Sequence, residues 1–245
     1  MSRNYEMLLA LKDGQIVSSP RPVLVEDGPA PPAHLSRLEK NALFNLVQRL
    51  FVIPGPHTAP RSVLFCSVGE VCLCASLALQ LAEALVASAN SSVCLVDANF
   101  QSPSLHRLIG PLSRRSLAEA LRSPSDVHSF VQQLSPSGVS FLTAGSVVPF
   151  PDTPLSEERL RPCLTELRSH FDRILMLAPP FGPHEDALWL GRLADGVVLV
   201  LEAGTTRRDL ALRAKASFDA VGVKVLGAVL TEHKIPIPKT LDRFL

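Results

Sequence analysis

The residues best suited to chemistry follow short apolar runs. The first group lies between a run that ends at Cys66 and a helix-like stretch. A glycine-containing turn between a strand and a helix is a framework for cradling phosphate, because it presents backbone N–H groups to an anion. The candidate cradle residues are Ser67, Gly69, Glu70, Val71, Cys72, Leu73 and Cys74.

This cradle lacks the side chains that handle phosphate and Mg²⁺. A working loop uses glycine for close approach, lysine for phosphate charge and Ser or Thr for Mg²⁺. Directly before and at the start of the helix-like stretch, where such a loop carries these groups, this chain has Val71, Cys72 and Leu73. A charge-assisted hydrogen bond contributes roughly 1.5–3 kcal/mol, so losing two or three weakens ATP binding by roughly a hundredfold to more than ten-thousandfold. We therefore expect no bound cofactor.

The cysteines of the cradle allow a second interpretation. A turn could bring the thiolates of Cys66, Cys72 and Cys74 together around a metal ion. No fourth ligand has a matching spacing, and His57 is the one histidine within reach upstream. We favour the reading in which the cysteines are small apolar substitutes in an inactive cradle, and we expect no metal.

A second polar group follows the apolar run at 93–97 and contains Asp97, Asn99 and His106. Asp97 could act as a catalytic base if the site is active, or it could cap the loop that follows. His106 is expected to pack or to form a backbone hydrogen bond.

Two further positions have both a functional and a structural interpretation. Asp186 could orient the site, or it could be an acid in the first turn of a helix, where the helix dipole favours it. Arg207 and Arg208 are expected at a solvated helix start rather than in a docking patch.

The elements that must position these residues alternate along the chain. Short β-branched or apolar runs occur at 62–66, 93–97, 139–144, 173–177, 196–202 and 224–230, and helix-like segments at 72–88, 156–171, 184–193 and 207–221. Near-continuous apolar strands separated by helices predict an α/β fold with a doubly wound, mostly parallel sheet and helices on both faces. Ligands bind such sheets at the carboxyl ends of the strands.

The chain is expected to hold one domain, from residue 36 to 245, after a flexible proline-rich tail at 1–35. A short helix is predicted at 36–51. The net charge of +1 gives no reason to expect nucleic acid. Five cysteines, an odd number, favour a reducing compartment, so we expect a cytoplasmic protein. The apolar stretch at 71–89 is long enough to span a membrane, but Gln80 and Glu83 favour a buried helix.

Three segments resemble the bacterial tyrosine kinases of the CpsD/CapB type, which act in capsule and exopolysaccharide synthesis. LVDANFQSPSLHRLIG is similar to the second Walker-type motif of the family. FDRILMLAPPFGPHEDALWLGRLADGVVLVLEAGTTRRD is similar to its Walker B segment and the next strand, and KVLGAVLTEHK to the strand that ends at an adenine-reading Asn. The resemblance runs from Ser36 to the C-terminus and implies a P-loop NTPase fold of the deviant Walker A group. The wider MinD/ParA group shares this fold.

The departures from the family pattern fall on the chemistry. Asn99 replaces the later acid of the second motif, Leu177 stands at the Walker B position, and Thr231 takes the place of the adenine-reading Asn. The family phosphorylates its own C-terminal tyrosine cluster, whereas the one tyrosine here is Tyr5.

The ring-forming pattern of the family, Glu-x-x-Arg-x-x-Arg, falls on Glu39, Ala42 and Asn45. Both arginines are missing, which argues against a family-type ring, although a homo-oligomer of another kind stays open.

Two classes of function follow. The first is a catalytically inactive pseudokinase of polysaccharide synthesis and export that binds an inner-membrane chain-length or export protein, and meets the membrane through that partner. The alternative is an active ATP-dependent protein-tyrosine kinase with an atypical nucleotide site. A septum- or DNA-partition ATPase is a third, weaker idea.

Overall fold

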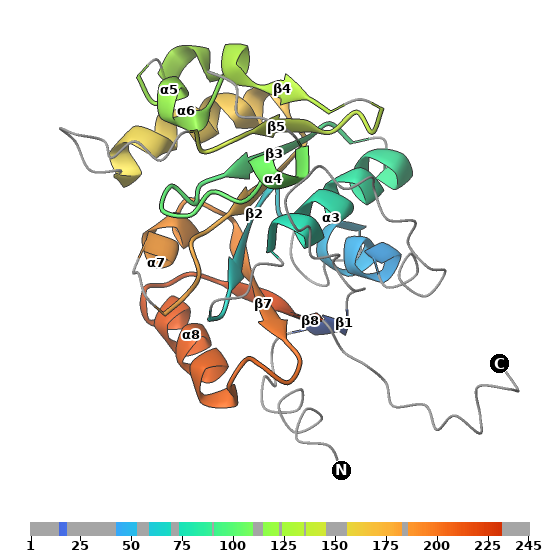
Figure 1. The fold of residues 1–245 in the computed structure, drawn as a ribbon, viewed down its shortest axis with the longest axis vertical. Coiled ribbons are helices and arrows are strands. Elements are labelled where there is room, and N and C mark those ends of the chain that lie inside the picture. The colour runs from blue at the N-terminus through green and yellow to red at the C-terminus, as the bar shows by residue number, and fades with distance from the viewer. Residues whose placement is uncertain are drawn as a thin grey trace, which may run out of the picture.

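The computed structural model describes ten stretches of the chain: residues 15–18, 43–52, 59–69, 74–89, 91–109, 115–122, 124–134, 136–145, 156–182 and 186–231. Their core is an eight-stranded sheet in the order β1-β8-β7-β2-β6-β3-β5-β4 (Figure 1). Every neighbouring pair is parallel except β4 and β5. The predicted α/β fold with a mostly parallel sheet is confirmed.

Six strands match the predicted apolar runs: β2 (Ser62–Ser67), β3 (Val93–Asp97), β5 (Ser140–Leu142), β6 (Arg173–Leu177), β7 (Gly196–Glu202) and β8 (Val225–Thr231). The central strands β2, β3 and β7 are buried almost throughout. Both of their faces meet helices, which is why their sequences are continuously apolar rather than alternating.

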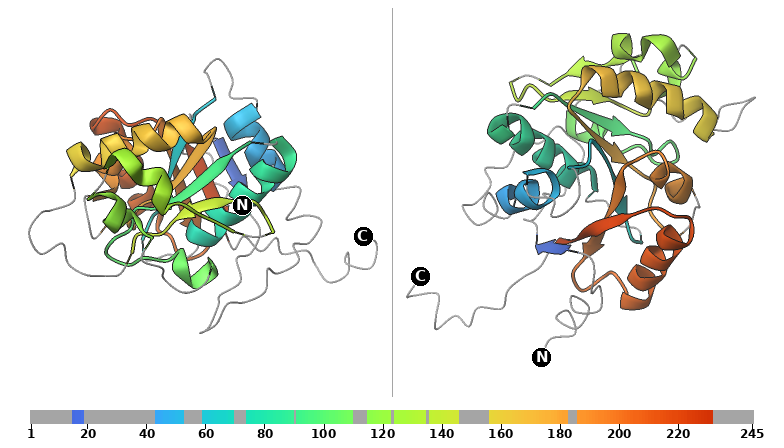
Figure 2. Two further views of the ribbon diagram at one scale, coloured as in Figure 1. Left: turned by 90° about the horizontal axis from the view of Figure 1, so that it is seen from above. Right: turned by 180° about the vertical axis from the view of Figure 1, so that it is seen from behind.

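Helices cover the two faces of the sheet (Figure 2). One face packs against α3 (Cys74–Ala89) and against helical residues 43–47, which continue into η1 (Gln48–Val52). The other face packs against α6 (Glu157–His170), α7 (Asp186–Gly191) and α8 (Arg208–Ala220). Each strand therefore contributes alternate side chains to two separate apolar layers.

Several elements were not predicted. They are the short helices α4 (His106–Ile109) and α5 (Leu117–Ala120), the 3-10 helix η2 (Pro124–Phe130), and the two-residue strand β4 (Gln132–Gln133). Each is brief, and such segments carry too few residues to show a periodicity.

One part of the expected N-terminal tail needs correction. Gln15–Ser18 form the edge strand β1, which pairs in parallel with Gly227 to Leu230 of β8. The N–H and C=O groups of an edge strand are open to pairing, so four residues of suitable backbone complete the ladder. The rest of the tail and the expected helix start at 36–42 lie outside the described residues.

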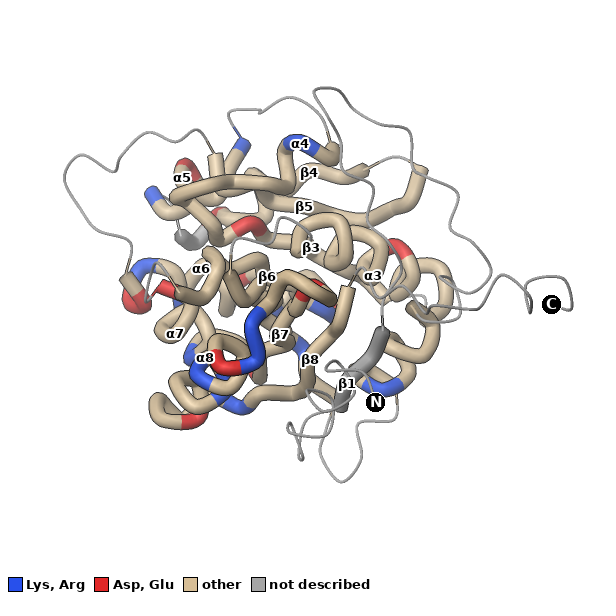
Figure 3. The backbone as a smooth tube through the Cα atoms, turned by 60° about the horizontal axis from the view of Figure 1, so that its bottom comes forward, with Lys and Arg blue, Asp and Glu red and all other residues tan. Residues whose placement is uncertain are grey.

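None of the helices in the described part of the chain has the length and apolar character that crossing a bilayer requires. The candidate span at 71–89 contributes α3, whose buried face is formed by residues such as Leu77, Leu81 and Leu85. Gln80 and Glu83 lie at partly exposed positions of this helix. Acidic and basic residues are interspersed over α6 and α8 (Figure 3).

Candidate functional site

Three neighbouring strands bring the predicted site residues together at one edge of the sheet. In the order β2-β6-β3, Phe65 pairs with Leu177, and Leu177 pairs with Asp97. Paired residues of parallel strands point to the same face, here the face covered by α3. Asp97 and the Walker B position are therefore direct neighbours in the sheet.

Asp97 is completely buried, and its carboxylate is engaged by its own loop. One oxygen accepts a hydrogen bond from the backbone N–H of Asn99 at 3.1 Å. The other accepts from the N–H groups of Ser104 and Leu105, each at 3.0 Å. The geometry is that of a loop-capping carboxylate, which is the structural alternative of the sequence analysis.

The pKa of Asp97 reflects two opposing effects. Burial raises the pKa and outweighs the three backbone hydrogen bonds and the nearby His106, all of which lower it. His106 is the first residue of α4, and its buried Nδ1 has no hydrogen-bond partner within the described structure. The expected backbone hydrogen bond is therefore not formed by this nitrogen.

Asn99 closes the same loop. Its side-chain N–H donates to the carbonyl of Ser102 at 2.8 Å, and its side-chain oxygen accepts from the N–H of Ser102 at 3.0 Å. Both polar groups of the amide are satisfied within three residues. Asn99 thus serves the loop that surrounds Asp97.

Leu177 makes the neighbouring position apolar. Its side chain is 1% exposed and belongs to the same apolar cluster as Phe65, Cys74 and Leu105. An aspartate here would offer an oxygen to a metal ion, whereas leucine offers only hydrocarbon to it. The described surroundings of Asp97 therefore contain no second acid at the Walker B position.

The start of the predicted cradle is held by backbone contacts. The N–H of Val68 donates to Val200 O at 3.0 Å, and the N–H of Gly69 donates to Phe181 O at 3.1 Å. Gly69 has a φ of 85°, a conformation that glycine adopts without strain. Cys74 begins α3, while Glu70, Val71, Cys72 and Leu73 lie outside the described residues.

Phe181 and Thr206 are contacts that sequence reasoning missed. The N–H of Phe181 donates to Ser67 O at 2.8 Å, and Thr206 Oγ1 lies 3.4 Å from Val68 O. The loops after β6 and β7 thereby fasten the end of β2. The Pro179-Pro180 pair marks the first loop in the sequence, but it carries no sign of this pairing.

The described cysteines of the cradle are buried thiols. Burial raises the pKa of Cys66 to about 12, and burial together with Cys66 and Asp97 raises the pKa of Cys74 well above its usual value. Metal ligation and nucleophilic attack need the thiolate, which such an environment disfavours. Among the described residues, no group of three or more side chains could hold a metal ion. Cys72 lies outside them.

Two other predicted residues lie away from Asp97. Thr231 ends β8, two strands from β2, and its hydroxyl donates to Leu201 O at 3.1 Å. Asp186 begins α7 and accepts from Gln101 at 2.7 Å and from the Trp189 indole at 3.2 Å. Asp186 therefore links α7 to the loop that follows Asp97, which fits both of its proposed roles.

Arg207 and Arg208 lie on the surface at the start of α8. Arg207 pairs with Asp209 at 3.0 Å, and both side chains are largely exposed. An exposed pair of this kind adds little to stability. The expected solvated helix start is confirmed.

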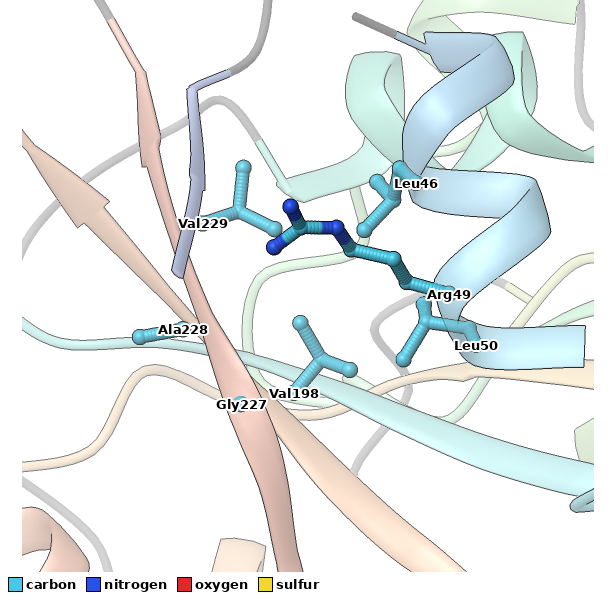
Figure 4. A pocket seen from close by; sticks show the side chains of 7 residues that line it. All are labelled: Leu46, Arg49, Leu50, Val198, Gly227, Ala228 and Val229. Atoms are coloured by element: carbon cyan, nitrogen blue, oxygen red, sulfur yellow. The ribbon is translucent and has the colours of Figure 1, made fainter. Parts of the chain in front are cut away.

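A hollow in the protein lies elsewhere, under the helix at 43–52. It is lined by Leu46, Arg49 and Leu50 of the helix, Val198 of β7, and Gly227, Ala228 and Val229 of β8. Arg49 reaches from the helix toward Val229 (Figure 4). These strand positions precede the carboxyl ends, so the hollow is not the predicted cradle.

Comparisons with known proteins bear on this geometry. Tyrosine-protein kinase YwqD of Bacillus subtilis is 29% identical over 149 residues, which make up 61% of this chain and 63% of YwqD. Tyrosine-protein kinase CpsD of Streptococcus agalactiae is 26% identical over 160 residues, 64% of this chain and 67% of CpsD. No family model matches the chain. The chain thus matches less than two thirds of the length of YwqD.

Solved structures share the fold. The chimerical protein CapA2B2 has a TM-score of 0.78 at 20% identity, covering 94% of this chain and 99% of that one. A chain of the MinC:MinD cell division protein complex of Aquifex aeolicus has a TM-score of 0.59 at 14% identity, covering 75% of this chain and 72% of that one. The P-loop NTPase-like fold follows from both.

Proposed function

We propose that this chain, which belongs to the bacterial tyrosine-kinase family of the CpsD/CapB type, is a pseudokinase of capsule or exopolysaccharide synthesis. It acts by binding an inner-membrane chain-length or export protein rather than by phosphorylating. It meets the membrane only through that partner. The family placement is the premise, and the loss of catalysis is the step that the site supports.

One observation carries the proposal: the carboxylate of Asp97 already accepts hydrogen bonds from its own loop. All three described hydrogen bonds of Asp97 come from backbone N–H groups, and the side chain is 0% exposed. A base must reach the proton that it removes, within hydrogen-bond distance or through one water. Asp97 can do so only if the loop opens.

The residue beside Asp97 supports the same conclusion. An Mg²⁺ ion prefers oxygen ligands in octahedral geometry, and Leu177 presents an apolar side chain at the strand position paired with Asp97. Restoring glycine, lysine and threonine at Val71, Cys72 and Leu73 would leave this position unchanged. We expect that triple variant to stay inactive.

The first test is the binding of MgATP to the full chain by calorimetry. We expect no saturable binding in the micromolar range, and micromolar affinity would overturn the proposal. Tyr5 is the one tyrosine of the chain, so Tyr5→Phe serves as the matched control for autophosphorylation. If the chain is a kinase that modifies itself, wild type acquires phosphotyrosine and Tyr5→Phe does not.

The second test is made in the source bacterium. Deleting the gene should reduce or alter the exported polysaccharide, and Asp97→Asn, which keeps one acceptor oxygen, should restore it near to normal. Abundance and the thermal midpoint of the variant must match wild type. A folded, abundant Asp97→Asn protein that behaves like the deletion would favour the active kinase.

A further inference from the structure

A histidine pair joins two elements on the side of the molecule away from the α3 face. His128 belongs to η2 and His170 is the last residue of α6. Their ring centroids lie 4.4 Å apart, and the ring planes differ by 35°. Both residues are exposed, so a dissolved ion can reach them.

The backbone and the ring of His128 are held by neighbouring residues. Glu166, one turn before His170, accepts hydrogen bonds from the backbone N–H of Val127 at 2.5 Å and of His128 at 3.2 Å. The ring of Phe171 stacks on His128 with centroids 6.0 Å apart. η2 is thus attached to α6 where the two imidazoles meet. Because the two elements are already held together, binding a ligand there costs less conformational entropy.

The spacing suits two imidazoles on one metal ion. With metal–nitrogen bonds of about 2.1 Å, rings at right-angled positions of one ion have centroids about 4.5 Å apart, and rings at tetrahedral positions about 5.2 Å. The observed centroid separation of 4.4 Å is closer to the value for right-angled positions than to the tetrahedral value. Square-planar or tetragonal coordination by nitrogen and oxygen is typical of Cu²⁺ and Ni²⁺.

We propose that His128 and His170 bind a divalent transition-metal ion, with water in the remaining positions. Glu166 is assigned the role of holding η2 on α6, through the N–H groups of Val127 and His128, and is not assigned as a ligand. The bound ion links η2 to α6 and stabilises the folded state, since the unfolded chain does not hold the two rings together. This site is independent of the sheet edge that carries Asp97.

The test is a Ni²⁺ titration of the full chain, prepared without a histidine tag and freed of metal. We expect wild type to bind one Ni²⁺ at least tenfold more tightly than His128→Asn, His170→Asn or the double variant. His34→Asn, which removes a histidine outside the pair, should bind like wild type. Mg²⁺ should not bind, because it prefers oxygen ligands.

A thermal unfolding series provides the second readout. Ni²⁺ should raise the midpoint of wild type and of His34→Asn, and should leave the double variant unchanged. Equal Ni²⁺ affinity in wild type and the double variant would overturn the proposal. The proposal would also be overturned if His34→Asn lost as much Ni²⁺ affinity as the variants of His128 and His170.

Discussion

The edge of the sheet at which the parallel strands begin (the amino edge) and the edge at which they end (the carboxyl edge) have opposite characters. At the amino ends, charged and hydroxyl groups form a network: Asp195 accepts from the N–H groups of Arg61 and Ser62, each at 2.8 Å, and from Arg168 at 3.2 Å. At the carboxyl ends, Asp97 is sealed by its loop beside the apolar Leu177. The ion pair between Arg168 and Asp195 therefore supports the edge that is not expected to bind a ligand.

This contrast predicts that the two edges contribute to the stability of the fold in different ways. The amino edge joins β2, α6 and the start of β7 through groups that partly face water, where each polar atom can be hydrated if a partner is lost. The carboxyl edge buries its polar atoms, so a change there leaves a donor or a charge without a partner. Substitutions at the two edges should differ in size and in their response to pH.

The largest effect is expected for Leu177→Asp, which restores an acid at the Walker B position. It places a second carboxylate beside Asp97 in an apolar cluster, and an uncompensated buried charge costs about 3–5 kcal/mol. Chemical denaturation should show this loss, with Leu177→Met, expected to cost under about 1.5 kcal/mol, as the control. An Asp variant as stable as wild type would show that the edge already accepts a charge.

Asp97→Ala should have the next largest effect. It leaves the N–H groups of Asn99, Ser104 and Leu105 without their acceptor, and an unsatisfied buried donor costs about 1–3 kcal/mol. Asp97→Asn should lose less, because one acceptor oxygen remains. If Asp97→Ala lowered the unfolding free energy by less than a substitution at an exposed position does, Asp97 would not have the predicted role of capping its loop.

The pH dependence of Asp97 sharpens this prediction. Burial raises the folded-state pKa of Asp97 above its unfolded value, so the folded state takes up the proton first on acidification. Between the two pKa values, lowering the pH therefore increases the unfolding free energy of wild type relative to Asp97→Asn. If the unfolding free energy of wild type instead fell relative to Asp97→Asn as the pH is lowered, the three backbone N–H groups would outweigh burial in setting the pKa of Asp97.

Asp195→Ala should cost about 1–3 kcal/mol, because two backbone N–H groups and Arg168 lose a charged acceptor that water only partly replaces. Asp219→Ala is the matched control, since Asp219 makes an exposed pair with Lys215. That pair should contribute under about 0.5 kcal/mol. Equal losses in both variants would remove the distinction between the network and an ordinary surface pair.

The smallest effect is expected for Asp172→Asn at the amino edge. Asp172 accepts from the hydroxyl and N–H of Ser92, which lower its pKa. Its contribution is therefore present above the unfolded pKa and lost as the pH falls through the folded pKa. Wild type and variant should converge in unfolding free energy in acid, which is the reverse of the trend for Asp97.

Much of the fold could be predicted because its signals are long and repeated. The runs at 93–97 and 173–177 coincide with β3 and β6. The order of the strands, which makes Asp97 and Leu177 neighbours, was not predicted, because the apolar runs do not say which strands pair. The three amides around Asp97 could not be predicted, since they depend on the path of the loop to Leu105. Phe181 was missed for the same reason: its role is a backbone pairing that any residue could make.

The four residues of β1 have a practical consequence for protein production. A chain shortened to begin at residue 36, where the domain was expected to start, would lack the strand that pairs with Gly227 to Leu230. The buried strand β8 would then present an open row of N–H and C=O groups to other molecules. Such a fragment should self-associate through this edge, and a solubility screen should begin its series of N-terminal truncations before Gln15.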